Sequence, residues 1–112
     1  MNAAIKALWI EELRNGHRKQ GKGRLRTSPN NRFCCLGILC ELAVAAGVIP
    51  APTLSGDSYE YEACRSIPPA AVCSWAGMRN STGSYAHGNF LVVDNDRGKT
   101  FAEIADIIEK HF

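Results

Sequence analysis

Apolar side chains recur with helical spacing near both ends of the chain. Near the start they come three to four positions apart and Gly16 follows them, so we predict a helix over Ala3–Asn15 that Asn2 caps. Near the end, Thr100 and Glu103 have the spacing of a capping box, which predicts a last helix from this point. The stripe residues are Ile5, Leu8, Trp9 and Leu13 in the first helix and Phe101, Ile104, Ala105, Ile108 and Phe112 in the last.

The residues over Phe33–Ala46 are apolar almost without interruption. A helix that is apolar on nearly every face lies in the core, so we predict a buried central helix over this range. Asn30 or Asn31 is positioned to cap it, and Gly47 follows its end. Because glycine weakens a helix interior, Gly37 indicates a place where another part of the chain crosses closely.

The stretch after the central helix has the composition of a loop. Residues 48–67 are rich in proline, glycine and polar residues, and we expect the part over residues 50–66 to be mobile. Pro68-Pro69 then opens a short third helix that Gly77 ends.

Two short segments have the pattern of strands. Alternation predicts one strand over Gly23–Thr27, with Leu25 inward. Asn89–Asp94 predicts a second strand, and Asn95–Gly98 a turn. We expect Leu25 and Phe90–Val93 to pair as a two-stranded ribbon on the helices.

These elements predict a small, helix-dominated α+β single domain over residues 1–112. The domain has about four helices, with the buried helix 33–46 at the centre, and one short two-stranded β element. The length of 112 residues allows one domain, and an apolar share of 46% excludes wholesale disorder.

Charge is distributed unevenly along the chain. Residues 1–32 carry eight Lys or Arg and two Glu, a net charge of +6, whereas residues 33–112 carry five Lys or Arg and nine Asp or Glu, a net charge of −4. The asymmetry indicates an anionic partner for the basic part, or an acidic surface of the same fold that lies against it.

Residues 14–32, the basic segment, are the first candidate site. They can line a phosphate backbone or another anionic ligand. No aromatic residues are interleaved and no helix-turn-helix spacing is present, so base stacking is not indicated. The alternative is a solvated face that offsets the acidic remainder. The candidate residues are Arg18, Lys19, Lys22, Arg24, Arg26 and Arg32.

Cys34 and Cys35, at the start of the predicted central helix, are the second candidate. A helix N-terminus lowers the pKa of a thiol, and His87 stands just before a predicted strand. A cysteine at a helix start and a histidine beside a strand follow the logic of papain-like thiol hydrolases. The alternative, which we favour, is that both cysteines pack in the core.

We expect no metal site and no cofactor. The cysteines stand at 34, 35, 40, 64 and 73, which is not the spacing of a zinc site. No apolar run is long enough to span a membrane, and the charged first helix is unlike a signal peptide, so we expect a reducing cytosol. The acidic-aromatic stretch Tyr59–Glu62 is expected to be solvated or to contact a basic partner.

Two stretches of the sequence carry a resemblance. The first runs through Leu13-Arg14-Asn15-Gly16, Gln20-Gly21-Lys22-Gly23-Arg24-Leu25-Arg26 and Phe33-Cys34-Cys35-Leu36-Gly37-Ile38-Leu39-Cys40, and the second through Asn95-Asp96 and Thr100-Phe101-Ala102-Glu103-Ile104-Ala105. They resemble a family of small, uncharacterised proteins of tailed bacteriophages and prophages, mainly those of actinobacteria. The resemblance covers nearly the whole chain. It implies a phage origin and action in a bacterial host, and it brings no established activity.

From these features we expect a non-enzymatic phage accessory protein. It would bind a host or phage macromolecule during infection, for host takeover or counter-defence, through the basic segment. A host or phage protein is the expected partner, acting in the cytoplasm of the bacterial host. The alternatives are a nucleic-acid-binding protein and a small thiol hydrolase that uses Cys34 or Cys35 with His87.

Overall fold

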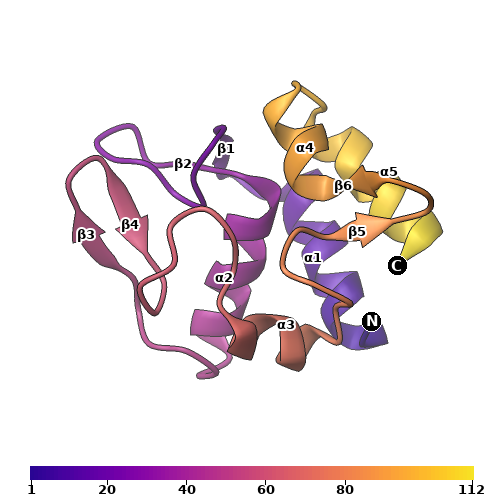
Figure 1. Cartoon of the computed structure of the whole chain (residues 1–112), viewed down its shortest axis with the longest axis horizontal. Helices are drawn as coiled ribbons and strands as arrows, with labels where there is room; N and C mark the ends of the chain where they lie inside the picture. Colours follow the sequence, from indigo (N-terminus) through magenta and orange to yellow (C-terminus); the bar gives the residue numbers. More distant parts are fainter.

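The computed structural model describes all residues, 1–112, and has five helices and three two-stranded sheets around one core (Figure 1). The domain is a small α+β fold, as predicted, with one helix more than predicted. The helices are α1 (Ala3–Asn15), α2 (Cys35–Ala45), α3 (Ala70–Ala76), α4 (Leu91–Asp96) and α5 (Phe101–His111). The strands are β1 (Lys19–Gln20), β2 (Arg32–Phe33), β3 (Thr53–Ser55), β4 (Ser58–Glu60), β5 (Ser84–Tyr85) and β6 (Asn89–Phe90).

Helix α2 lies at the centre of the core, as the sequence predicts (Figure 1). Every residue from Cys35 to Cys40 is buried, and α2 packs against α1, α3 and α4. The indole Nε1 of Trp9 donates a hydrogen bond to the carbonyl of Cys35 at 2.9 Å inside this core. The bond satisfies the one polar group of a fully buried indole and fixes α1 against the first turn of α2.

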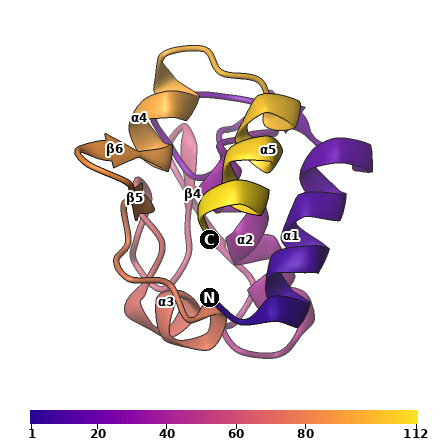
Figure 2. The ribbon, with the colours of Figure 1, turned by 90° about the vertical axis from the view of Figure 1, so that its right-hand side faces the viewer.

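Helices α1 and α5, far apart in the sequence, lie side by side (Figure 2). Their predicted bounds and caps are confirmed: Asn2 accepts a hydrogen bond from the N–H of Ile5, and Thr100 and Glu103 form the capping box. The buried residues come from the predicted stripes, except that Leu8 is exposed. They are Ile5, Trp9 and Leu13 in α1 and Ile104, Ala105 and Ile108 in α5.

Helix α2 begins two residues later than predicted, and neither Asn30 nor Asn31 caps it. The cap is Cys34, whose Sγ accepts a hydrogen bond from the N–H of Gly37 at 3.4 Å. The residues before it, Arg32–Phe33, form β2 and pair with β1, so they cannot join the helix.

The close crossing expected at Gly37 is confirmed. A Cβ atom at this position would lie 1.9 Å from the carbonyl oxygen of Leu25. The same carbonyl accepts a hydrogen bond from the N–H of Cys34 at 3.2 Å. The basic segment therefore passes directly over the first turn of α2, and only glycine leaves room for it.

The predicted strand over Asn89–Asp94 is wrong beyond β6, because the chain turns into α4 at Leu91. Leu91 and Asn95, four positions apart, are both fully buried, so they share the inward face of a helix. The first two N–H groups of α4 donate to carbonyls of Gly83 and Thr82, at 3.0 and 3.3 Å. A distant loop thus supplies the helix cap, and packing overrides the strand propensity of the local residues.

The predicted β ribbon is also wrong. Over Gly23–Thr27 only Arg26 and Thr27 make isolated bridges, and Leu25 does not pair with Phe90–Val93 although it is buried as predicted. The observed pairs are β1 with β2 in parallel, and β3 with β4 and β5 with β6 antiparallel.

The segment predicted as loop contains the hairpin β3–β4, at the left of Figure 1. Ser58 of this hairpin bridges to Thr27 of the basic segment, which joins the two parts of the chain. Tyr61 is fully buried whereas Glu62 is exposed, so the expectation that Tyr59–Glu62 is solvated is wrong for Tyr61. The mobility of residues 50–66 stays a prediction. No helix in the fold combines the length and the apolar character needed to cross a bilayer.

Candidate functional site

The basic segment crosses over the core and then pairs with its own start. It leaves α1, forms β1, crosses α2 at Leu25 and returns as β2, where Lys19 lies opposite Arg32 in parallel register. A Cβ atom at Gly21 would lie 2.7 Å from the Cβ of Arg32, so glycine permits this close return.

The buried side chain of Asn95 ties the basic segment to α2. Its Oδ1 accepts hydrogen bonds from the N–H of Cys35 at 3.1 Å and from Nε2 of Gln20 at 2.9 Å, and its Nδ2 donates to the carbonyl of Gly21 at 2.8 Å. Gln20 in turn accepts from the N–H of Phe101 at 3.1 Å. Several residues of the sequence pattern on which the resemblance rests therefore stabilise the fold. They are Gln20, Gly21, Cys35, Asn95 and Phe101.

Two of the six predicted cations are held by carboxylates of the same fold. Arg18 pairs with Glu12 at 2.9 Å and lies 3.9 Å from Glu41, and Arg26 lies 3.7 Å from Glu41. The alternative reading of the charge asymmetry, an acidic surface against the basic segment, is thus correct for these two residues.

The other four predicted cations are exposed and have no carboxylate partner within 4.0 Å. Arg24 makes only neutral contacts, to the Ser66 hydroxyl and the Gly23 carbonyl, both at 3.2 Å. Their charges are therefore available to a partner. They are Lys19, Lys22, Arg24 and Arg32.

A polar cavity of about 420 Å³ opens between the basic segment and α2. Among its lining residues Phe33 is the one apolar side chain, and Glu41 is the one acid. The others are His17, Arg18, Lys19, Arg26, Asn30 and Asn31. The structure thus brings three of the six predicted cations to one cavity.

Arg26 is fixed on the wall of this cavity by two aromatic rings. Its guanidinium lies 4.1 Å from the ring centre of Tyr59 and 5.0 Å from that of Phe33, and its Nε donates to Oδ1 of Asn31 at 2.7 Å. Cation–π contacts of this kind hold a guanidinium flat. The basic partner considered for Tyr59–Glu62 is thus the chain's own Arg26.

Glu41 is a site residue that the sequence analysis missed, and so is its contact with Tyr61. The hydroxyl of Tyr61 donates to Oε2 of Glu41 at 2.6 Å, and burial together with this carboxylate raises the pKa of Tyr61. A lone charged residue in the apolar stretch of α2 was the available signal for Glu41. Tyr61 stands in the acidic-aromatic stretch Tyr59–Glu62, but nothing local links it to α2.

The two candidate thiols lie in the core rather than on a cleft. Burial raises the pKa of Cys34 to about 11 and raises that of Cys35 as well. Sγ of Cys35 points to the carbonyl of Leu91, and no cysteine lines a cavity. His87 is exposed in the turn between β5 and β6. Desolvation therefore outweighs the effect of the helix N-terminus, and neither thiol is poised as a thiolate.

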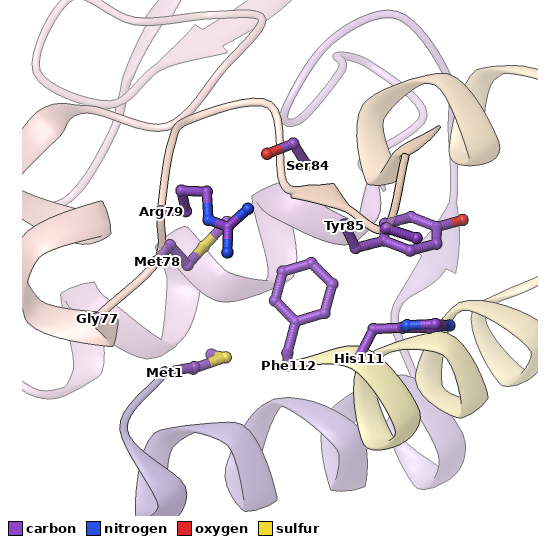
Figure 3. Close-up of a pocket in the computed structure, with 9 residues that line it drawn as sticks. Met1, Gly77, Met78, Arg79, Ser84, Tyr85, His111 and Phe112 are labelled. Carbon is purple, nitrogen blue, oxygen red and sulfur yellow. The ribbon is translucent and has the colours of Figure 1, made fainter. Parts of the chain in front are cut away.

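A second cavity, of about 410 Å³, lies beside the ends of α1 and α5 (Figure 3). The ring of Tyr85 lies 5.1 Å from that of His111 and its hydroxyl donates to Asp94; burial and this bond raise the pKa of Tyr85 to about 12. Met1 and Phe112 line the same cavity. No three histidine, cysteine, aspartate or glutamate side chains in the fold are arranged to hold a metal ion.

The fold and this site define a small α+β domain with a basic surface and a polar, cationic cavity. Across its whole length, residues 1–112, the chain matches the family described as Domain of unknown function (DUF8296), and it belongs to that family. No curated protein and no solved structure matches the chain.

Proposed function

We propose that this is a non-enzymatic accessory protein of a bacteriophage, which binds a macromolecule in the cytoplasm of the bacterial host through its basic segment. The observation that carries the proposal is the group of four exposed cations without carboxylate partners, at Lys19, Lys22, Arg24 and Arg32. Exposed, unpaired charges on a rigid segment steer and orient an oppositely charged partner.

The arrangement favours an acidic protein surface over a nucleic acid as the partner. A carboxylate stands among the four free cations: Asp96 accepts a hydrogen bond from the N–H of Gly23, between Lys22 and Arg24, at 2.9 Å. A continuous phosphate backbone would be repelled by such interspersed negative charge, whereas a protein of mixed charge can match it.

The experiment compares charge-removal variants in capture from phage-infected host lysate, with and without nuclease. Two double variants, Lys19→Ser with Arg32→Ser and Lys22→Ser with Arg24→Ser, each remove two of the cations. The matched control, Arg79→Ser with Lys110→Ser, removes two exposed cations outside the basic segment.

We expect a protein partner that survives nuclease, that salt weakens, and that the two basic-segment variants lose while the control keeps it. Capture that disappears with nuclease, together with salt-sensitive binding of the purified protein to duplex DNA, would establish the nucleic-acid alternative instead. A capture profile identical in all variants would overturn the role of the basic segment.

A further inference from the structure

We infer that the polar cavity beside α2 is a binding site for a phosphate group, carried by a free ion or by a small molecule about the size of a nucleotide. This goes beyond the macromolecular partner, because it rests mainly on Arg18 and Arg26, which are not among the four free cations; Lys19, the third cation at the cavity, belongs to both groups. Nothing in the proposed function requires the cavity.

Unused hydrogen-bond donors are the first observation. A guanidinium has five N–H groups, yet Arg18 donates only through Nη1, to Glu12, and Arg26 only through Nε, to Asn31. Their contacts with Glu41, at 3.9 and 3.7 Å, are ion pairs longer than hydrogen bonds. Nη2 of Arg18 and both Nη atoms of Arg26 therefore have no hydrogen-bond acceptor in the chain.

Charge is the second observation. Three cations and one carboxylate line the cavity, an excess of two positive charges, and Glu12 outside the wall reduces this excess to one. Oε2 of Glu41 accepts a hydrogen bond from the hydroxyl of Tyr61 at 2.6 Å, and neither oxygen of Glu41 lies within hydrogen-bond distance of an arginine. A phosphate group, with a charge of about −1.5 to −2 as a monoester, complements such an excess.

The placement of the donors favours phosphate over carboxylate. Arg18 and Lys19 are neighbours at the start of β1, and Arg26 lies on the crossing part of the basic segment, so the donors reach the cavity from two places. The oxygens of a tetrahedral phosphate point in different directions and can accept from all of them. A carboxylate has two oxygens in one plane, which suit a single guanidinium fork.

The site is also rigid and of suitable size. The Arg26 side chain is 20% exposed and the Arg18 side chain 27%, and both guanidiniums lie over the ring of Phe33. Side chains that are already ordered lose little entropy on binding. A volume of about 420 Å³ falls within the range of small-molecule sites, roughly 300–1,000 Å³, and has room for more than a phosphate group.

The test is an NMR titration of the purified, ¹⁵N-labelled full chain with inorganic phosphate, a nucleoside 5′-monophosphate and acetate, at constant ionic strength. The reporters are the Nε–H groups of Arg18 and Arg26. Asn31→Asp adds a negative charge at the cavity and keeps the oxygen that accepts from Arg26. Asn30→Asp adds a negative charge at an exposed residue whose side chain makes no hydrogen bond. Asn89→Asp, in β6, is the control with the same charge change.

We expect saturable shifts of both reporters with phosphate and not with acetate, and a Kd raised about tenfold by Asn31→Asp or Asn30→Asp but unchanged in the control. If the monophosphate binds more tightly than inorganic phosphate, the ligand is a molecule about the size of a nucleotide. If the two bind equally, the ligand is the free phosphate ion. An equal response to acetate, or no saturation with either phosphate or the monophosphate, would overturn the site. Lysate capture remains a separate readout, so either proposal can fail alone.

Discussion

At the scale of single residues, the carboxamide of Asn95 connects three parts of the chain. Asn95 belongs to α4 and is fully buried, and its side chain bonds to the basic segment and to the first turn of α2. All three of its hydrogen bonds are to groups 60 or more positions away. A buried polar group without a partner costs about 1–3 kcal/mol. The contribution of Asn95 is therefore set by the groups that it satisfies as much as by its own burial.

Asn95→Ala should lower the free energy of unfolding by roughly 2–4 kcal/mol, because it leaves the N–H of Cys35 and the carbonyl of Gly21 without partners. Urea denaturation followed by circular dichroism measures the change. The exposed Asn89, changed to Ala, is the control and should shift stability by less than about 0.5 kcal/mol. A loss no larger than the control's would mean that Asn95 does not organise the segment.

Gly37→Ala sets two effects of opposite sign against each other. Alanine favours a helix over glycine by about 1 kcal/mol, but its Cβ would meet the carbonyl oxygen of Leu25 at 1.9 Å. Because that atom is backbone, overpacking should win and destabilise the protein by roughly 1–3 kcal/mol or more. Thermal unfolding measures the net sign, and Ala45→Gly on the exposed end of α2 measures the propensity effect alone. A stabilised Gly37→Ala protein would contradict the crossing.

The site residues show what sequence reasoning could and could not reach at this scale. The run of cations was visible as composition, so Arg18, Lys19 and Arg26 could be named. That Arg18 and Arg26 are held by Glu41, and that Tyr59 covers Arg26, depends on contacts between residues 15 or more positions apart. No local pattern reports such contacts.

At the scale of elements, the helices with their own end signals were predictable. Asn2 caps α1, the capping box opens α5, and Gly77 ends α3 in the left-handed conformation with φ 71°. Helix α4 has no such signal, since carbonyls of Gly83 and Thr82 satisfy its first N–H groups. An element that takes its cap from a distant loop cannot be found by reading its own residues.

The capping box of α5 makes part of the stability depend on pH. The N–H of Thr100, and then its hydroxyl, donate to Glu103 and lower the pKa of that carboxyl below its ordinary 4.5. A lowered pKa means that the contribution is present above 4.5 and is lost as the pH falls through the folded-state value. Glutamine can fill the same position without titrating.

We therefore expect Glu103→Gln to reduce the fall in unfolding free energy between about pH 6 and about pH 3 relative to the unaltered protein. Urea denaturation at several pH values measures this. Glu62→Gln, which removes an exposed carboxylate without a hydrogen bond or ion pair in the fold, is the control for general charge effects. Parallel pH curves for Glu103→Gln and the unaltered protein would contradict the role of the box.

At the scale of the whole molecule, the fold class followed from the sequence but the arrangement did not. A nearly continuous apolar stretch had to be central, and α2 is. The three small sheets could not be foreseen, because strands of two or three residues carry too few positions for an alternating pattern. The charge asymmetry likewise allowed two interpretations, an anionic partner or an acidic surface of the same fold. Only the fold shows that Arg18 and Arg26 pair with carboxylates of the chain and that the other four cations do not.

Burial of the core should be visible in the reactivity of the five thiols. Cys34, Cys35 and Cys40 are buried with raised pKa values, whereas Cys64 and Cys73 are half-buried. Near neutral pH, iodoacetamide should add to the latter two first, and to the other three only when the whole domain unfolds. Mass spectrometry of the intact protein counts the adducts, with denatured protein as the reference for full labelling. Rapid labelling of Cys34 or Cys35 in folded protein would reopen the hydrolase alternative.

The packing of α1 against α5 also has a consequence during synthesis. Arg14 of α1 pairs with Asp106 and Glu109 of α5, at 2.8 and 2.6 Å, and Trp9 meets Phe112 edge to face. A ribosome makes the first helix long before the last one, so the part of the apolar stripe of α1 that packs against α5 stays exposed while the rest of the chain is translated. Nascent chains that stop short of α5 should therefore bind chaperones or be degraded, and only the chain that includes α5 can close its core.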